Sequence, residues 1–405
     1  MESNSTLQLE QLSLGDATAS QIFEATQTSV SSKATLASLC LVNRYFVEIA
    51  RPILYHEIHL QPNGYRCSCI PTTNTTYVTA TRTLCSANSL ADLVKTIKLT
   101  LDPTKEDVNW KLLKNVMGRC KRLERVTTGW EGCQTSEATA KLFEAIGAGA
   151  ASIKHLEVPV PIARLPPISK LLVTTTQLET LVFKPVDVDH KVKLKFRLRE
   201  VVWMSRLPQR ALGIYLSAST LTLIKISCHI AYENPPSLDI FPNLSTLRLV
   251  LGPFNLPESK RSNDLSEQQC SDAIKLILRS THSLPLRSLA VITRHAETAE
   301  TLRHYAILDS LPPALSELTT NPHLLCDNNI RLLFSTNNTS RYPSLRSLKI
   351  VPSFLTTSLE DSEHEWMKAS LQAVAKAFGS KELSIAIRLG AKLGERFLDE
   401  EACSL

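Results

Sequence analysis

Apolar residues recur along this chain in one short pattern: an apolar residue, two others, an apolar residue, one other and a third apolar residue. The pattern is clearest at Leu244-Leu247-Leu249 and Leu345-Leu348-Ile350, which are near copies of each other. In its last two apolar positions the period is two, so both side chains enter the same face of a short β-strand. One such strand buries only half a core, so neighbouring strands have to stack to complete it.

The same pattern occurs at many further places between residues 94 and 350. The middle residue of each copy serves as a marker, and most markers are 20 to 30 residues apart. This spacing is typical of leucine-rich repeats, in which a helix returns the chain to the start of the next strand. The further copies are Ile153-Leu156-Val158, Leu178-Leu181-Phe183, Leu198-Val201-Trp203, Leu221-Ile224-Ile226 and Leu286-Leu289-Val291, with incomplete copies at Val94-Ile97-Leu99, Leu123-Val126 and Leu315-Leu318.

Segments with helical periodicity lie between these strands, as a strand-and-helix repeat requires. A stretch rich in proline, serine and charge at 253–269 predicts an inserted loop before a helix at about residues 266–281. An amphipathic helix at Glu363–Ala377 and the alternating sequence KELSIAIRL are predicted to close the array. The other helical patterns are Trp110-Leu113-Val116-Met117, Leu142-Phe143-Ile146, Ile274-Ile277-Leu278 and Leu302-Tyr305-Ile307.

The predicted fold is α/β: a leucine-rich-repeat solenoid of parallel strands and returning helices over residues 55–405, after a disordered tail at 1–15 and a small helical segment at 16–54. The asparagine that usually follows the strand in regular repeats is mostly missing. We therefore expect the repeats to be of the irregular kind.

The segment 16–54 contains three short helical patterns. Ile22 and Phe23 mark the first, Leu36, Leu39 and Val42 the second, and RYFVEIARPIL the third, which Pro52 is predicted to end before a YHEIHL strand. About forty residues cannot form a stable core alone. The segment therefore needs either a partner or the array to pack against.

The run TLASLCLVNRYFVEIARPILYHEIHL resembles the second half of an F-box followed by the first strand of a repeat domain, a layout common in fungal F-box-like proteins. The resemblance implies docking onto a Skp-type adaptor, which bridges to a cullin-RING ubiquitin ligase. The Leu-Pro pair that normally opens the motif is absent, and a helical cap on the first repeat is the alternative interpretation. The adaptor-binding residues that the resemblance implies are Ile22, Phe23, Leu36, Leu39, Leu41, Val42, Arg44 and Phe46.

Composition narrows the class of partner. The chain has 43% hydrophobic and 21% charged residues, as a foldable soluble protein does, and its net charge of +6 comes from 45 basic and 39 acidic residues spread along the sequence. A nucleic-acid-binding protein usually has a stronger and more clustered excess. No apolar run reaches the roughly 20 residues of a membrane-spanning helix. With a polar start and unevenly spaced cysteines, we expect a reducing compartment, cytoplasmic or nuclear, and no disulfide framework.

No segment has the spacing of a catalytic or metal site. Cys67, Cys69 and Cys85 are predicted to be free thiols rather than zinc ligands, because structural zinc takes four ligands in two close pairs. The glycines at 147 and 149 close a helical stretch and are predicted to end a helix rather than cradle a phosphate. We expect no enzyme activity and no cofactor, although dispersed catalytic residues do not show in one sequence.

A run of alternating cations and apolar residues, HKVKLKFRLRE, is the strongest binding feature. On an extended chain its cations share one face, which suits an acidic or phosphorylated partner segment. The alternative is a solubilising edge that prevents strand pairing. The candidate partner-binding residues are Lys191, Lys193, Lys195, Arg197 and Arg199.

The resemblance and the repeats together predict a substrate-recruiting adaptor subunit of a cullin-RING (SCF-type) ubiquitin ligase. Residues 16–54 would hold the adaptor and the array would bind an unknown substrate protein, with no nucleic acid or membrane involved. A leucine-rich-repeat scaffold without a ligase is the alternative. An enzyme with its site on the loops between strands is the third option.

Overall fold

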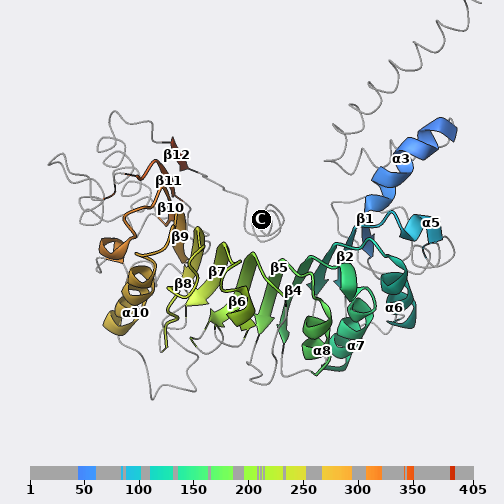
Figure 1. The fold of residues 1–405 in the computed structure, drawn as a ribbon, viewed down its shortest axis with the longest axis horizontal. Helices are drawn as coiled ribbons and strands as arrows, with labels where there is room; N and C mark the ends of the chain where they lie inside the picture. The colour runs from blue at the N-terminus through green and yellow to red at the C-terminus, as the bar shows by residue number, and fades with distance from the viewer. Residues whose placement is uncertain are drawn as a thin grey trace, which may run out of the picture. The chain divides into compact units, whose positions relative to one another are not determined.

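The computed structural model divides into two compact units, and Figure 1 shows their secondary structure. The first consists of Met1–Val160 and Leu165–Leu178, and the second of Pro161–Arg164 and Glu179–Leu405. The residues that the structure describes are 44–60, 84, 88–101, 110–130, 136–162, 166–185, 196–207, 209, 212, 215–230, 234–251, 267–293, 307–321, 342, 344–350 and 384–387.

The first unit alternates parallel strands with helices. Strand β1 pairs with β2, β2 with β3 and β3 with β4. Helices α6, α7 and α8 lie side by side along one side of these strands (Figure 1). The elements are α3 (Arg44–His56), β1 (Glu57–Leu60), α5 (Asn88–Ala91), β2 (Thr96–Leu101), α6 (Trp110–Arg119), β3 (Arg125–Trp130), α7 (Ser136–Gly147), η1 (Ala150–Ser152), β4 (His155–Ile162) and α8 (Pro166–Thr174).

The second unit also consists of parallel strands, and its connections between β5 and β8 are shorter than those that follow β8. Each strand from β5 to β12 pairs in parallel with the next one in the chain. The elements are β5 (Thr180–Pro185), β6 (Glu200–Leu207), η2 (Ser217–Ser219), β7 (Lys225–Ile230), β8 (Thr246–Leu251), α10 (Glu267–Ser280), β9 (Ser288–Thr293), η4 (Ile307–Ser310), β10 (Glu317–Thr320), β11 (Ser347–Ile350) and β12 (Ser384–Ile387).

The marker residues of the sequence pattern form a ladder, as predicted. In the second unit Leu181, Leu247 and Leu348 belong to one row of directly paired residues, which also contains Val201, Ile226, Leu289, Leu318 and Ile385. In the first unit the row is Ile58, Ile97, Val126 and Leu156. Within each unit the strands follow one another in the order of the chain and every printed pairing is parallel, so the α/β leucine-rich-repeat fold is confirmed.

Hydroxyl side chains that precede the strands bind backbone carbonyls of the preceding repeat. At the start of most strands one carbonyl accepts two backbone N–H groups of the next repeat; the Arg199 carbonyl, for example, accepts those of Ile224 and Lys225 at 2.8 and 3.1 Å. Thr222 Oγ1 donates to the Leu198 carbonyl at 2.8 Å, and Ser316 Oγ to the Arg287 carbonyl at 3.0 Å. Serine and threonine hydroxyls therefore add hydrogen bonds between neighbouring repeats, in the case of Arg287 to a carbonyl that also accepts two backbone N–H groups.

The predicted register of one repeat is wrong. Leu221 was expected in the core, but its side chain is 72% exposed, whereas Leu223 and Ile226 are fully buried and Ile226 pairs with Leu247. The segment TLTLIKISC contains two overlapping apolar patterns. The correct one, Leu223-Ile226-Cys228, has a cysteine as its third apolar residue, because a thiol packs as a small hydrophobic group.

Pro52 does not end the third N-terminal helix. Helix α3 continues to His56, so the strand begins at Glu57 rather than at Tyr55. Proline has a helical φ and removes one hydrogen bond, the one to the carbonyl four residues earlier, at Glu48. Glu48 and Pro52 are both exposed, so water can satisfy that carbonyl and the helix tolerates the proline.

The helical predictions agree with the structure where it describes them. Helix α6 buries Leu113, Val116 and Met117, and α10 begins at Glu267, close to the expected position. The final strand within KELSIAIRL is β12. The predicted helix at Glu363–Ala377, the inserted loop before α10, and Leu302 and Tyr305 lie outside the described residues. Buried residues of the other helices include Leu142, Phe143, Ile146, Ile274, Ile277 and Leu278.

Gly149 allows the backbone after α7 to approach α6. Helix α7 ends at Gly147, which confirms the predicted helix stop. A β-carbon on Gly149 would lie 2.7 Å from the carbonyl oxygen of Met117, whereas one on Gly147 would have nothing within 4 Å. Only at Gly149 would a side chain force the backbone of the neighbouring helix to move.

Gly149→Ala is therefore expected to lower the free energy of unfolding by about 1 to 3 kcal/mol. Gly147→Ala is the matched control and is expected to leave the stability unchanged or slightly higher, because alanine favours the helix. Urea unfolding followed by circular dichroism measures both. Equal stability of the two variants would contradict the close contact.

Candidate protein-binding surface

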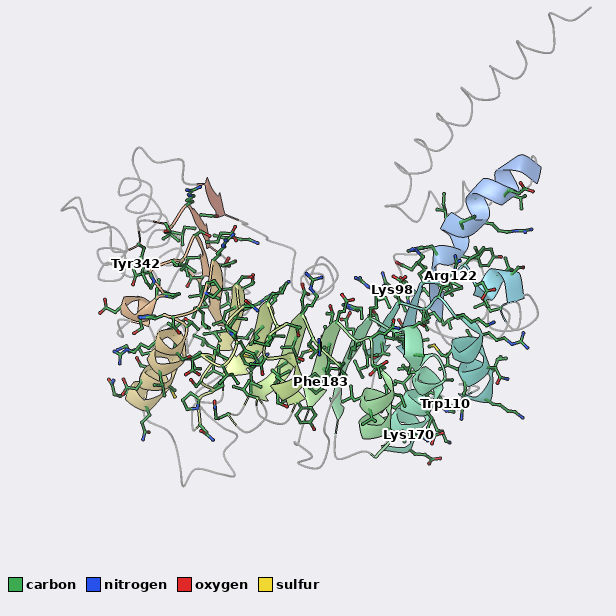
Figure 2. All side chains as sticks on the ribbon, viewed as in Figure 1. Lys98, Trp110, Arg122, Lys170, Phe183 and Tyr342 are labelled. Atoms are coloured by element: carbon green, nitrogen blue, oxygen red, sulfur yellow. The ribbon has the colours of Figure 1, made fainter. Side chains whose placement is uncertain are left out.

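The side chains that alternate with the buried markers point away from the core and form the candidate binding surface. In the first unit we call them the first outward face: Glu57, His59, Thr96, Lys98, Thr100, Arg125, Thr127, His155 and Glu157. Figure 2 shows Lys98 on the other side of the strands from Trp110 and Lys170, which lie on helices. In the second unit the second outward face comprises Thr180, Val182, Glu200, Val202, Lys225, Ser227, Thr246, Arg248, Ser288 and Ala290.

Contacts between strands connect charged groups on the first outward face. Lys98 Nζ lies 3.1 Å from Glu57 Oε1 on the adjacent strand. Thr127 Oγ1 donates a hydrogen bond of 3.3 Å to Glu157 Oε2, and His155 Nε2 lies 3.9 Å from the same oxygen. Acidic groups on this face thus already have polar neighbours on their own sheet. The first outward face is therefore polar, and polar neighbours partly balance its charged groups.

The second outward face has a cationic part, formed by Lys225 on β7 and Arg248 on β8. Lys225 Nζ lies 4.0 Å from Glu200 Oε2, at the outer limit of an ion pair, and the two side chains are 17% and 27% exposed. Burial lowers the pKa of Lys225; Glu200 raises it and the guanidinium of Arg248 lowers it, and the net direction is downward.

The predicted basic stripe is described only at its end. Arg197 and Arg199 are exposed, and they alternate with the buried Phe196 and Leu198, as expected for an extended segment. These four residues precede strand β6 and are not part of it. Lys191, Lys193 and Lys195 lie outside the described residues, so the stripe as a whole stays a prediction.

Most of the predicted adaptor-binding residues also lie outside the described part of the chain. Arg44 and Phe46 are in helix α3, which runs directly into β1. The helical prediction for this part is confirmed, and its role in adaptor binding stays a prediction. The others, outside the described residues, are Ile22, Phe23, Leu36, Leu39, Leu41 and Val42.

Within the described ranges, no group of three or more His, Cys, Asp or Glu side chains is placed to hold a metal ion. Cys67, Cys69 and Cys85 lie outside those ranges. Cys228 is buried in the core of the second unit, and this burial raises the pKa of its thiol to about 12, so the thiol stays protonated. No helix among the described residues is both long and apolar enough to cross a membrane.

Comparisons with known proteins show similarity only to solved structures. No family model and no curated protein matches the chain. The leucine-rich-repeat-containing protein LegL7 from Legionella pneumophila shares 12% identity over 82% of this chain and 91% of that one, with a TM-score of 0.39. A Bacteroides fragilis protein shares 12% identity over 77% and 69%, with a TM-score of 0.30. The class of the fold rests on the strand ladder of this chain itself.

The sequence patterns missed the cationic part of the second outward face. Lys225, Ser227 and Arg248 are separated by apolar residues along two different strands, so no charged run marks them. The signal was present in the outward positions of the repeat pattern. Both registers of β7 place Lys225 and Ser227 outward, but only the correct one pairs Ser227 with Arg248 on β8.

Proposed function

We propose that this chain is a substrate-recruiting subunit of a cullin-RING ubiquitin ligase. Residues 16–54 would dock onto the Skp-type adaptor, and the outward face of the repeat strands would bind the protein to be ubiquitinated. The observation that supports the binding role is the ladder of parallel strands. It presents side chains in rows about 4.8 Å apart, which gives a partner protein a regular surface to contact.

Such a subunit performs no bond chemistry of its own. It holds a lysine of the partner near a charged conjugating enzyme and so raises the effective concentration of the two reactants. Resemblance to the F-box supports the docking role, on residues Leu36, Leu39, Leu41, Val42, Arg44 and Phe46. The continuous connection from helix α3 to strand β1 supports a direct link between docking segment and array.

A pull-down with the purified Skp-type adaptor tests the docking role. The full chain is expected to retain the adaptor, and the variant Leu39→Asp with Phe46→Asp is expected to lose at least about tenfold in affinity, because charges replace apolar contact groups. Leu276→Asp is the control, since this leucine on α10 is 57% exposed. Circular dichroism melts confirm that the variants are folded.

A second candidate is a repeat scaffold with no link to a ligase. The absence of the Leu-Pro pair from the F-box-like segment favours it. So does the ladder from β1 to β12, whose paired residues all lie beyond residue 54. A full chain that retains no adaptor, or that retains it equally after both substitutions, would decide for the scaffold.

A further inference from the structure

Cationic residues cluster at the edge of the first unit where strands β2, β3 and β4 begin. Lys95 and Lys154 directly precede β2 and β4, and Arg125 is the first residue of β3. Lys121 and Arg122 lie in the turn between α6 and β3. Lys95 is half-buried and the other four are exposed. We call these five residues the basic edge.

Hydrogen bonds between neighbouring repeats hold the backbone of the basic edge together. The Lys95 carbonyl accepts the N–H groups of Glu124 and Arg125 at 2.8 and 2.9 Å, and the Glu124 carbonyl accepts that of Lys154 at 2.8 Å. Neighbouring strands of a sheet are about 4.8 Å apart, so the backbones of Lys95 and Lys154 lie roughly 10 Å from each other across β3. The parallel ladder therefore fixes the spacing of these cations.

The cations of the basic edge have few acidic neighbours. Among the described residues, the only ion pair that the basic edge makes joins Lys154 Nζ to Glu124 Oε1 at 4.0 Å, the outer limit of such a contact. On the first outward face, by contrast, Lys98 Nζ lies 3.1 Å from Glu57 Oε1. Like charges close together repel one another, so negative charge from a partner would stabilise the basic edge.

A segment of a protein suits the basic edge better than a continuous polyanion does. Glu124 lies within the edge, and the exposed Asp92 holds in the preceding repeat the position that Lys121 holds in its own. Nucleic acid carries negative charge without interruption along its backbone and would meet both carboxylates. The exposed large apolar side chain among the described residues of the first unit is Val173, on α8, which is no ring for a base to stack on.

We propose, building on the proposed function, that the basic edge binds a short acidic segment of the partner protein. The guanidinium groups of Arg122 and Arg125 would each donate two parallel N–H bonds to a carboxylate, a geometry that fits aspartate and glutamate. About three residues of extended chain span the roughly 10 Å between Lys95 and Lys154. The basic edge is therefore complementary to a segment of that length with two or more acidic side chains.

Fluorescence anisotropy with the full chain and a fluorescein-labelled peptide of alternating glutamate and serine tests the proposal. Wild type is expected to bind at low salt and more weakly at moderate salt. Arg122→Gln with Arg125→Gln is expected to weaken binding at least about fivefold. The matched control is Lys111→Gln with Lys114→Gln on α6, two exposed cations that are also three residues apart, with an expected change below about twofold. Figure 2 shows Trp110, which precedes Lys111, apart from Arg122.

Glu124→Gln gives a result that loss of folding cannot produce. It removes the carboxylate within the basic edge and is expected to tighten binding of the glutamate peptide about twofold to threefold. Equal weakening by the two pairs of substitutions, unchanged or weaker binding by Glu124→Gln, or no binding by wild type at low salt would overturn the proposal. So would a mixed-sequence single-stranded oligonucleotide that binds more tightly through the same two arginines. No adaptor is present in this assay, so its failure is distinct from a failed pull-down.

Discussion

Leu223→Ala is expected to lower the free energy of unfolding by about 2 to 5 kcal/mol, and Leu221→Ala by less than about 0.5 kcal/mol. Leu223 is fully buried at the position that begins the repeat before strand β7, whereas Leu221 is 72% exposed. Truncation of Leu223 removes apolar contacts and leaves a cavity between neighbouring repeats. Truncation of Leu221 removes a side chain that is already in water.

The two leucines control for each other, since they differ by two positions and undergo the same change. Urea unfolding of the full chain, followed by circular dichroism and by tryptophan fluorescence, gives both values. Losses of equal size, or a larger loss for Leu221→Ala, would mean that the register of β7 is the one that Leu221-Ile224-Ile226 predicts. The result therefore also decides whether Ser227 or Lys225 lies opposite Arg248 on β8.

The ladder itself was predictable because its physical requirement is local. Each strand must place two apolar side chains on one face. The spacing of Leu247 and Leu249 therefore predicts a strand without any information from the rest of the chain. Helix α6 was predictable for the same reason, from the spacing of Leu113, Val116 and Met117. The prediction failed where two registers were equally apolar, at Leu221 to Ile226, because only packing against Val201 and Leu247 selects one.

The cationic part of the second outward face was not predictable from runs of charge. Ser227 and Arg248 are 21 residues apart and become neighbours only when β7 and β8 pair in register. The run that the sequence does show, HKVKLKFRLRE, has only its last part within the described residues, where Arg197 and Arg199 are exposed as expected. Charged residues that become neighbours only through the pairing of two strands do not form a charged run in the sequence. The register of the strands has to be known before the outward residues of the pattern can be assigned to positions on the surface.

The pairing of β5 with β6 explains how the largest side chain in the core of the second unit is packed. Trp203 is 1% exposed, and its ring contacts that of Phe183 edge to face, with centroids 4.7 Å apart and an interplanar angle of 71°. The ring of Tyr215 lies 5.7 Å from it at 77°. Phe183 and Trp203 are register partners on β5 and β6. The three rings fill the space between these strands and the segment that follows β6.

Trp203→Ala is expected to lower the free energy of unfolding by about 3 to 5 kcal/mol, because it removes both ring contacts and leaves a large cavity. Trp203→Phe is expected to cost clearly less. The indole N–H is buried and meets no acceptor among the described residues, so phenylalanine keeps an aromatic ring at this position and removes an unsatisfied donor.

Urea unfolding of the two variants beside Trp110→Ala measures this difference. Trp110 is only half-buried at the start of helix α6, so its truncation is expected to cost less than that of Trp203. Equal losses for Trp203→Phe and Trp203→Ala would contradict the unsatisfied state of the indole N–H. A smaller loss for phenylalanine would mean that ring volume and edge-to-face contact, rather than a hydrogen bond, hold strands β5 and β6 to the segment behind them.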